Sequence, residues 1–184
     1  MQNRTMTTRR LTQSAAIAAL YVALTLIFEP ISFGAMQVRI AEALTILPLF
    51  TPAAIPGLFV GCLLANLLGG AIVVDVIFGS VATLIGAALG YALRSNRWLV
   101  PIPTIVANAL IVPPILRYGY GLEMPLALLA LYIAIGEIAG CYVLGELFGT
   151  VLMKHRRVFG EGAAQRGART PSGPDGVSGD DRKE

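Results

Sequence analysis

Long runs of residues without a charged side chain constrain this sequence most strongly. Four such runs, residues 11–28, 43–74, 76–93 and 98–116, hold 18, 32, 18 and 19 residues. A helix needs about 20 mostly apolar residues to cross a bilayer. Several such runs in one chain of 184 residues therefore predict an all-α, multi-pass protein of the cell membrane.

The 32-residue run can form one long helix or two short ones. Pro48, Pro52 and Pro56 interrupt it, and we place a boundary at Thr51-Pro52 because proline disfavours helix in the residue before it. Basic residues in short loops favour the cytoplasmic side. With the split, the chain has six helices, and eight basic residues lie on the cytoplasmic side and two outside. Without it, five helices would place four basic residues on the cytoplasmic side and six outside. We predict a six-transmembrane-helix bundle with both termini cytoplasmic and helices at about 11–28, 38–50, 53–69, 75–93, 98–116 and 124–152.

Polar segments flank the predicted bundle, which we assign to residues 11–153 as a substrate-binding domain. Residues 1–10 are interpreted as a short cytoplasmic N-terminal segment. Residues 154–184 are rich in glycine and charge, with almost no large apolar side chains. Such a segment cannot bury enough apolar surface to offset the entropy of ordering, so we predict a disordered cytoplasmic tail.

A strongly polar residue inside a bilayer is costly and therefore suggests a functional site. In the predicted topology most of these residues lie in the outer half, where a solute from outside would arrive. Glu137, near the middle of the last helix, is the strongest candidate. Glu146 lies nine residues further, on the opposite side of a helix, and is expected to reach the inner membrane surface. The candidate substrate-binding residues are Gln37, Arg39, Glu42, Asn66, Asp75, Asn108 and Glu137.

Most of these residues also have a purely structural explanation. Arg39 and Glu42 are three residues apart and can pair on one helical face. Asp75 can be a charge that is favoured at a helix N-terminus. Asn66 and Asn108 can hold helices together through hydrogen bonds.

The chain lacks the usual residues of catalytic and nucleotide-binding sites. Its single histidine is His155, it has no phosphate-binding glycine loop with a lysine, and Asp75 is the lone aspartate of the bundle. We therefore expect no enzyme activity, no cofactor and no metal-ligand cluster. The basic residues lie at the ends and in short loops, which argues against a nucleic-acid partner. Cys62 and Cys141 lie in apolar runs, so we expect no disulfide framework.

Small residues recur at every fourth position, a spacing that lets helix backbones approach closely. Four glycine pairs follow it, at 57/61, 86/90, 136/140 and 145/149, and we interpret them as packing within the monomer. Ala15, Ala19 and Ala23 form a similar row on the first helix.

Two blocks of residues resemble the QueT family of membrane proteins. The first is FGAMQVRIAEAL at residues 33–44, with a Q-x-R-x-x-E-A-L pattern, followed by Leu47-Pro48. The second combines GCLLAN at residues 61–66 with DVIFG at residues 75–79. The resemblance extends over about residues 10–153 and leaves out the tail.

This resemblance implies a substrate-binding subunit, or S-component, of an energy-coupling factor importer. Such subunits work with a separate transmembrane coupling subunit and two cytoplasmic ATPases. The implied substrate is a queuosine precursor, a deazaguanine base such as queuine or a prequeuosine. Related components pack a small-residue row of the first helix against the coupling subunit, so Ala15, Ala19 and Ala23 are the expected partner-binding residues.

The candidate residues suit a guanine-like base. A carboxylate can accept hydrogen bonds from the ring N–H and the exocyclic amine, and either Glu137 or Glu42 can fill this role. Asp75 matches a cationic aminomethyl group, and Arg39 can orient Glu42 or cap the pocket. The amide candidates, which can donate to the base carbonyl, are Asn108, Gln37 and Asn66.

Two other function classes remain open at this stage. One is a stand-alone secondary transporter driven by protons through Glu137 or Asp75. The other is a non-transport membrane protein, either a scaffold or an enzyme. The sequence shows no clear inverted repeat of the kind found in many secondary transporters, which disfavours the stand-alone transporter.

Overall fold

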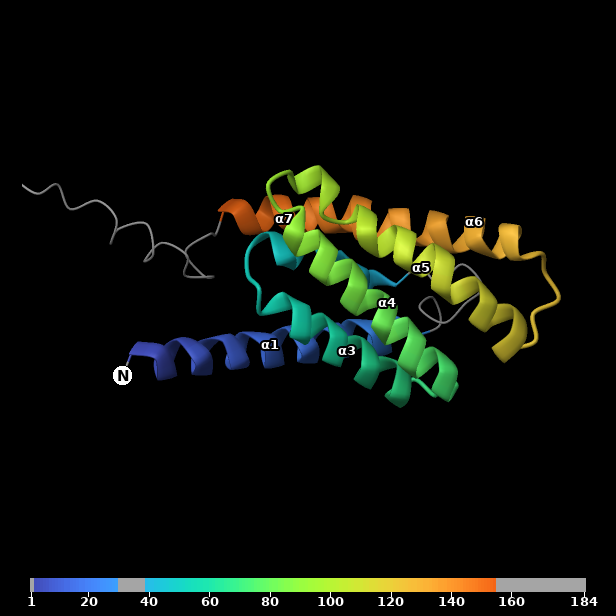
Figure 1. Ribbon diagram of the computed structural model, residues 1–184, viewed down its shortest axis with the longest axis horizontal. Helices are drawn as coiled ribbons and strands as arrows, with labels where there is room; N and C mark the ends of the chain where they lie inside the picture. Colours follow the sequence, from blue (N-terminus) through green and yellow to red (C-terminus); the bar gives the residue numbers. More distant parts are fainter. Residues whose placement is uncertain (1, 30–38, 155–184) are drawn as a thin grey trace, which may run out of the picture. The chain divides into compact units, whose positions relative to one another are not determined.

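The computed structural model describes residues 2–29 and 39–154, with side chains from residue 7 onward. Every regular element in this part of the chain is helical (Figure 1). The all-helical prediction is therefore confirmed for the described residues. The elements are α1 (Gln2–Ile27), η1 (Ile40–Leu49), α3 (Ala54–Leu68), α4 (Val73–Ala92), η2 (Arg97–Leu99), α5 (Ile102–Pro114), η3 (Ile115–Gly119), α6 (Leu126–Glu137), η4 (Ile138–Leu144) and α7 (Gly145–Lys154).

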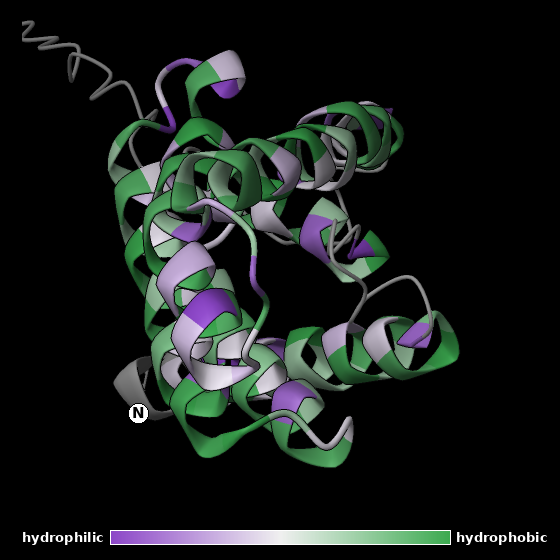
Figure 2. Ribbon diagram, turned by 90° about the vertical axis from the view of Figure 1, so that its right-hand side faces the viewer, coloured by the Kyte–Doolittle hydropathy of each residue, from purple (hydrophilic) through white to green (hydrophobic). Residues whose placement is uncertain are grey.

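Four helical stretches are long and apolar enough to cross a membrane by length and composition. They cover residues 7–27, 73–92, 97–119 and 126–154. Most of the ribbon has the colour of hydrophobic residues (Figure 2). Large apolar side chains such as Phe78, Leu110 and Leu131 are exposed on the surface of the described residues. This pattern suits a lipid environment. The prediction of six crossings with cytoplasmic termini stays a prediction.

Two predicted boundaries can be compared with the structure. The 32-residue apolar run does contain a break, because η1 ends at Leu49 and α3 begins at Ala54, on either side of Thr51-Pro52. The first helix is longer than the predicted span, since α1 begins at Gln2; the assignment of residues 1–10 to a cytoplasmic segment stays a prediction. Neither glycine nor proline occurs in residues 2–10 to end the helix. The predicted tail from residue 155 onward lies outside the described residues.

The short helix η1 lies at the centre of the packing, in contact with α1, α3, α4, η4 and α7. Its residues from Ala41 to Pro48 are all buried. Apart from Glu42 and Thr45, the side chains of η1 are apolar, which is expected of a helix surrounded by other helices. It is a 3₁₀-helix, and at about 2.0 Å per residue this conformation is longer and thinner than an α-helix of ten residues.

Glycines allow the neighbouring helices to approach one another. A Cβ atom at Gly61 would lie 2.8 Å from Cβ of Tyr21 on α1. Gly140 faces the backbone of Arg39, just before η1, while Gly145 and Gly149 face η1 itself at Ala43 and Ile46. These glycines pack within the monomer, as predicted. The same holds for Gly57, Gly86 and Gly90.

An ion pair fastens the segment between α4 and α5 to the last helix. Arg97 Nε donates to Glu146 Oε2 over 2.7 Å, and Arg97 Nη2 also donates to this oxygen. Thr150 Oγ1 accepts a further bond from Arg97 Nη2 at 2.9 Å. The expectation that Glu146 reaches the inner membrane surface stays a prediction. Its side chain is buried because a cation 49 positions away in the sequence comes to it.

We expect Arg97→Ala to destabilise the protein, because it leaves Glu146 buried without its cation. The expected loss in free energy of unfolding is about 1–3 kcal/mol, between the values for exposed and buried pairs. Thermal unfolding in detergent measures this loss. Arg94→Ala is the control, since Arg94 is exposed in the same segment. The double variant Arg97→Ala/Glu146→Gln should recover part of the loss. Equal melting temperatures for Arg97→Ala and Arg94→Ala would contradict this account.

Candidate functional site

Six of the seven predicted substrate-binding residues lie in one buried polar network. Their exposed fractions range from 0% to 5%. They come from five stretches of the chain that the fold brings together around η1. The six are Arg39, Glu42, Asn66, Asp75, Asn108 and Glu137; the seventh, Gln37, lies outside the described residues.

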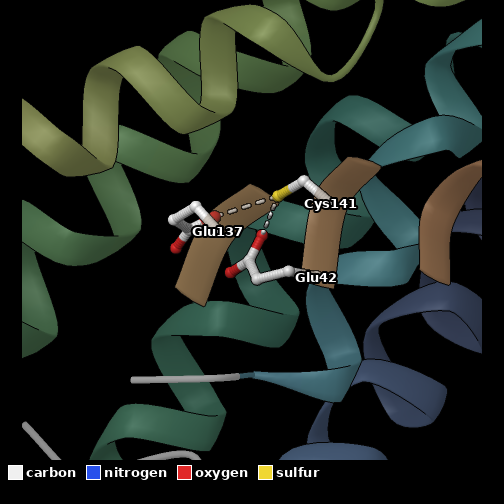
Figure 3. Close-up of side chains that lie close together, drawn as sticks. All are labelled: Glu42, Glu137 and Cys141. Carbon is white, nitrogen blue, oxygen red and sulfur yellow. Dashed lines mark hydrogen bonds between the residues drawn. The ribbon is translucent and has the colours of Figure 1, made fainter. Parts of the chain in front are cut away.

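Glu42 and Glu137, which we call the carboxylate pair, face each other from η1 and the end of α6. Cys141 lies between them and bonds to both (Figure 3). Its Sγ atom is 2.9 Å from Glu137 Oε2 and 3.8 Å from Glu42 Oε2. The pair therefore shares one weak donor, since a thiol hydrogen bonds less strongly than a hydroxyl or an amide.

Stronger donors hold the other oxygen of each carboxylate. The Tyr21 hydroxyl donates to Glu42 Oε1 at 2.5 Å, and Asn108 Nδ2 donates to Glu137 Oε1 at 2.8 Å. These donors compensate in part for the cost of burying charge in a low-dielectric interior. The helix-linking hydrogen bond considered for Asn108 is confirmed, and its partner is Glu137.

Local backbone conformation brings the pair together. Directly after Glu137 the helix widens into the π-helical segment η4, which contains Gly140 and Cys141. A Cβ atom at Gly140 would lie 2.8 Å from the backbone oxygen of Arg39 and 3.4 Å from Cβ of Glu42. The absence of a side chain at residue 140 therefore lets η1 approach Glu137. Single π-helical turns often occur at functional sites.

Asn66 and Asp75, which we call the Asn66–Asp75 pair, lie on the other side of Arg39. Asn66 Nδ2 lies 3.5 Å from the backbone oxygen of Asp75 and 3.6 Å from Cys62 Sγ. Oδ1 of Asn66 and Oδ1 of Asp75 are both buried without a hydrogen-bond partner. The position of Asp75 in the first turn of α4 fits the helix-terminus explanation, but that explanation does not account for its burial.

Tyr120, which follows η3, closes one side of the Asn66–Asp75 pair. Its hydroxyl donates to Asp75 Oδ2 at 2.9 Å and accepts from the backbone N–H of Ile72. Partial burial and the Asp75 carboxylate raise the pKa of Tyr120. Tyr120 therefore keeps its proton at neutral pH and remains a donor to Asp75.

Arg39 is the cation between the two pairs. Its Nη1 atom is 3.9 Å from Cys62 Sγ, and its guanidinium interacts electrostatically with Glu42 and Asp75. Pairing of Arg39 with Glu42 alone does not describe the contacts of Glu42, because its carboxyl group also bonds to Tyr21 and Cys141. Arg39 therefore links the carboxylate pair to the Asn66–Asp75 pair.

Comparison with known proteins identifies the family. A family model described as "QueT transporter" matches residues 11–154, which is most of the chain. The chain belongs to the QueT transporter family. A curated relative, "Queuosine precursor transporter QueT" of Lactococcus lactis subsp. cremoris (strain MG1363), is 38% identical over 81 residues. That alignment covers 43% of this chain and 47% of the relative, so it spans about half of the relative's length. No solved structure matches the chain.

The alanine row of this QueT family member lies on the outer side of α1. Ala15, Ala19 and Ala23 are exposed, whereas Tyr21 and Ala18 on the same helix are buried against the bundle. The structure thus separates the predicted partner-binding residues from the predicted substrate-binding residues. The row remains accessible in the isolated chain.

Two further features of the structure differ from the sequence-based expectations. Ligand atoms of Glu42, Glu137 and Cys141 lie within 4.8 Å of one another, so the fold does assemble three potential metal ligands. A cavity of about 370 Å³ lies apart from the polar network, between α4 and α5–η3. Its lining is mostly apolar and consists of Val74, Phe78, Ile111, Pro114, Ile115, Tyr118 and Gly119.

Sequence reasoning missed Tyr21, Cys141 and Tyr120 as members of the network. Cys141 follows Glu137 by one helical turn, and this spacing was a usable signal. Tyr21 and Tyr120 gave no such signal, because their partners Glu42 and Asp75 are 21 and 45 residues away in the sequence.

We expect Tyr21→Phe to lower the free energy of unfolding by about 1–3 kcal/mol, because it leaves a buried oxygen of Glu42 without a donor. The measurement is thermal unfolding of the purified protein in detergent. Tyr118→Phe makes the same chemical change at a side chain that is 76% exposed. A Tyr21→Phe protein as stable as the Tyr118→Phe protein would rule out the assigned role.

Proposed function

We propose that this chain is the substrate-capturing subunit of an energy-coupling factor importer and binds a queuosine precursor, a deazaguanine base, from outside the cell. The observation that carries the proposal is the buried polar network inside an apolar helical bundle, in a member of the QueT transporter family. A separate transmembrane coupling subunit and two cytoplasmic ATPases would supply the energy. The name of the relative from Lactococcus supports the substrate class.

The carboxylate pair is suited to the edge of the base that carries the ring N–H and the exocyclic amine. Carboxylate oxygens accept such hydrogen bonds, as in the recognition of base edges in nucleic acids. Tyr21 and Asn108 hold the outer oxygens of the pair, and the Cys141 thiol bonds to the inner ones. The thiol is the weakest donor in this arrangement. The N–H groups of a base can therefore replace it at the lowest cost.

The exposed face of α1 supports docking to a coupling subunit. Small side chains at Ala15, Ala19 and Ala23 permit close approach of a second helix in a membrane. The opposite face of α1 contacts α3 and η1. Docking at the alanine row would thus leave the packing of the bundle intact.

Equilibrium binding of a labelled deazaguanine base to the purified protein in detergent tests the substrate assignment. We expect saturable binding with about one base per chain. Glu137→Gln removes a charged acceptor, so we expect the affinity to fall about 10- to 100-fold.

Glu123→Gln is the matched control for this measurement, because Glu123 is exposed after η3 and outside the network. Folded protein that binds neither queuine nor an aminomethyl-deazaguanine would overturn the proposed substrate. Equal losses in both variants would overturn the proposed site.

Ala19→Leu tests the partner assignment. A larger side chain should prevent close helix approach, so we expect co-purification with the coupling subunit and ATPases to be lost while base binding persists. Ala88→Leu, on an exposed position of α4, is the matched control. Base uptake into proteoliposomes that contain this chain alone, driven by a proton gradient, would instead establish a stand-alone transporter.

A further inference from the structure

The apolar cavity is a groove on the surface of the bundle, where α4 packs beside α5 and η3 (Figure 1). Its volume of about 370 Å³ is within the range of ligand pockets. Val74, Phe78 and Tyr118, which line it, are exposed, so the groove opens outward. In a transporter family member with four helical stretches long enough to cross a membrane, the surroundings of such a groove are lipid.

The local sequence creates this groove. Pro113 and Pro114 end the regular α5 helix, because a proline lacks the N–H group and crowds the preceding turn. The chain then continues as the π-helical segment η3. Gly119, at the end of η3, leaves space beside α4, since a Cβ atom there would lie 2.5 Å from Cδ1 of Ile72. The two surfaces therefore enclose a hollow.

The lining of the groove favours a hydrocarbon chain as its occupant. Among the seven lining residues, Tyr118 alone has a side chain that forms hydrogen bonds. A deazaguanine base would leave most of its polar groups unpaired there, which is costly. A second transmembrane helix is disfavoured too, because such helices approach over small residues, and most of the lining residues are large. A flexible acyl chain needs no hydrogen-bond partner.

Arg117 supplies a cation beside the groove. It is exposed, and its guanidinium carbon lies 5.9 Å from the centre of the Tyr118 ring. Its Nη1 atom donates to the backbone oxygen of Met124 at 3.0 Å, which holds the side chain near the end of η3. Glu123, the nearest acid along the chain, forms no ion pair with it in the described structure. A guanidinium has five N–H donors, so Arg117 retains donors and charge for an anionic group.

The predicted topology also sets Arg117 apart. Basic residues in short loops favour the cytoplasmic side, and the two that fall outside in the prediction are Arg39 and Arg117. Arg39 belongs to the buried polar network. Arg117 is exposed at the edge of the bundle instead. A phosphate group suits it there, because a guanidinium binds phosphate through two parallel hydrogen bonds.

We propose that this groove binds one anionic phospholipid, with an acyl chain between α4 and α5–η3 and the phosphate on Arg117. The site is separate from the polar network, so the inference goes beyond the proposed function. Tyr120 follows η3 and donates to Asp75. A lipid bound along η3 would therefore also hold the segment that closes one side of the Asn66–Asp75 pair.

Lipid binding to the delipidated full-length protein tests the phosphate contact. Native mass spectrometry counts bound lipids in a neutral detergent during titration with dioleoyl phosphatidylglycerol or with dioleoylglycerol, which has the same acyl chains and no phosphate. We expect one phosphatidylglycerol per chain, bound about 5- to 10-fold more tightly than dioleoylglycerol. Arg117→Gln should remove this difference. Arg94→Gln is the matched control, because Arg94 is also exposed and beside a tyrosine, Tyr91, but not next to the groove.

Val74→Trp tests the acyl-chain contact, because the indole would fill the groove. We expect it to weaken the binding of both lipids at least fivefold. Val106→Trp is the matched control, since it makes the same change at an exposed position of α5 outside the groove. Both valines are exposed, so the bundle should fold in each variant, and retained base binding by the polar network verifies this.

The outcomes decide each part of the proposal. Equal affinities for the two lipids, or equal effects of Arg117→Gln and Arg94→Gln, overturn the phosphate contact. Equal effects of the two tryptophan variants overturn the groove as the lipid site. A particle of two chains that Val74→Trp disrupts, or displacement of phosphatidylglycerol by a deazaguanine base, assigns the groove to another occupant and overturns the proposal. Protein that binds phosphatidylglycerol but no base overturns the proposed function alone.

Discussion

Burial of two carboxylates within an apolar helical bundle is the constraint on which the rest of this structure depends. Glu42 and Glu137 can persist there only with donors placed against them, and Tyr21, Asn108 and Cys141 supply these donors from three different parts of the chain. Tyr21 orients α1 relative to η1 through Glu42, and Asn108 orients α5 relative to α6 through Glu137. The polar network therefore determines how the apolar helices pack as well as what they can bind.

The position of η1 follows from this constraint. It is short, thin and apolar apart from Glu42 and Thr45, so five other elements can surround it. Glycines on η4 and α7 remove the side chains that would hold it away from Glu137. The same arrangement gives α1 two faces. Tyr21 points to Glu42 on one face, while Ala19 and Ala23 are exposed on the other.

The sequence was enough to predict most residues of the candidate site, but few of the contacts between them. The cost of polar groups in a bilayer identified Arg39, Glu42 and Glu137 without any structure, and the prolines located the break before α3. Helix rotation is not encoded in hydropathy, so the contact of Tyr21 with Glu42 was not predictable. Long-range pairs such as Arg97 with Glu146 were missed for the same reason. The 3₁₀ and π conformations arise from tertiary packing rather than from local propensity.

Charge balance separates the two polar clusters of the bundle. Arg97 and Glu146 form a pair of opposite charges joined by two hydrogen bonds, an arrangement that fastens helices. The network around Arg39 has three carboxyl groups for one cation and leaves two acceptors open. Under the proposed function, the donors for these two acceptors would come from the ligand.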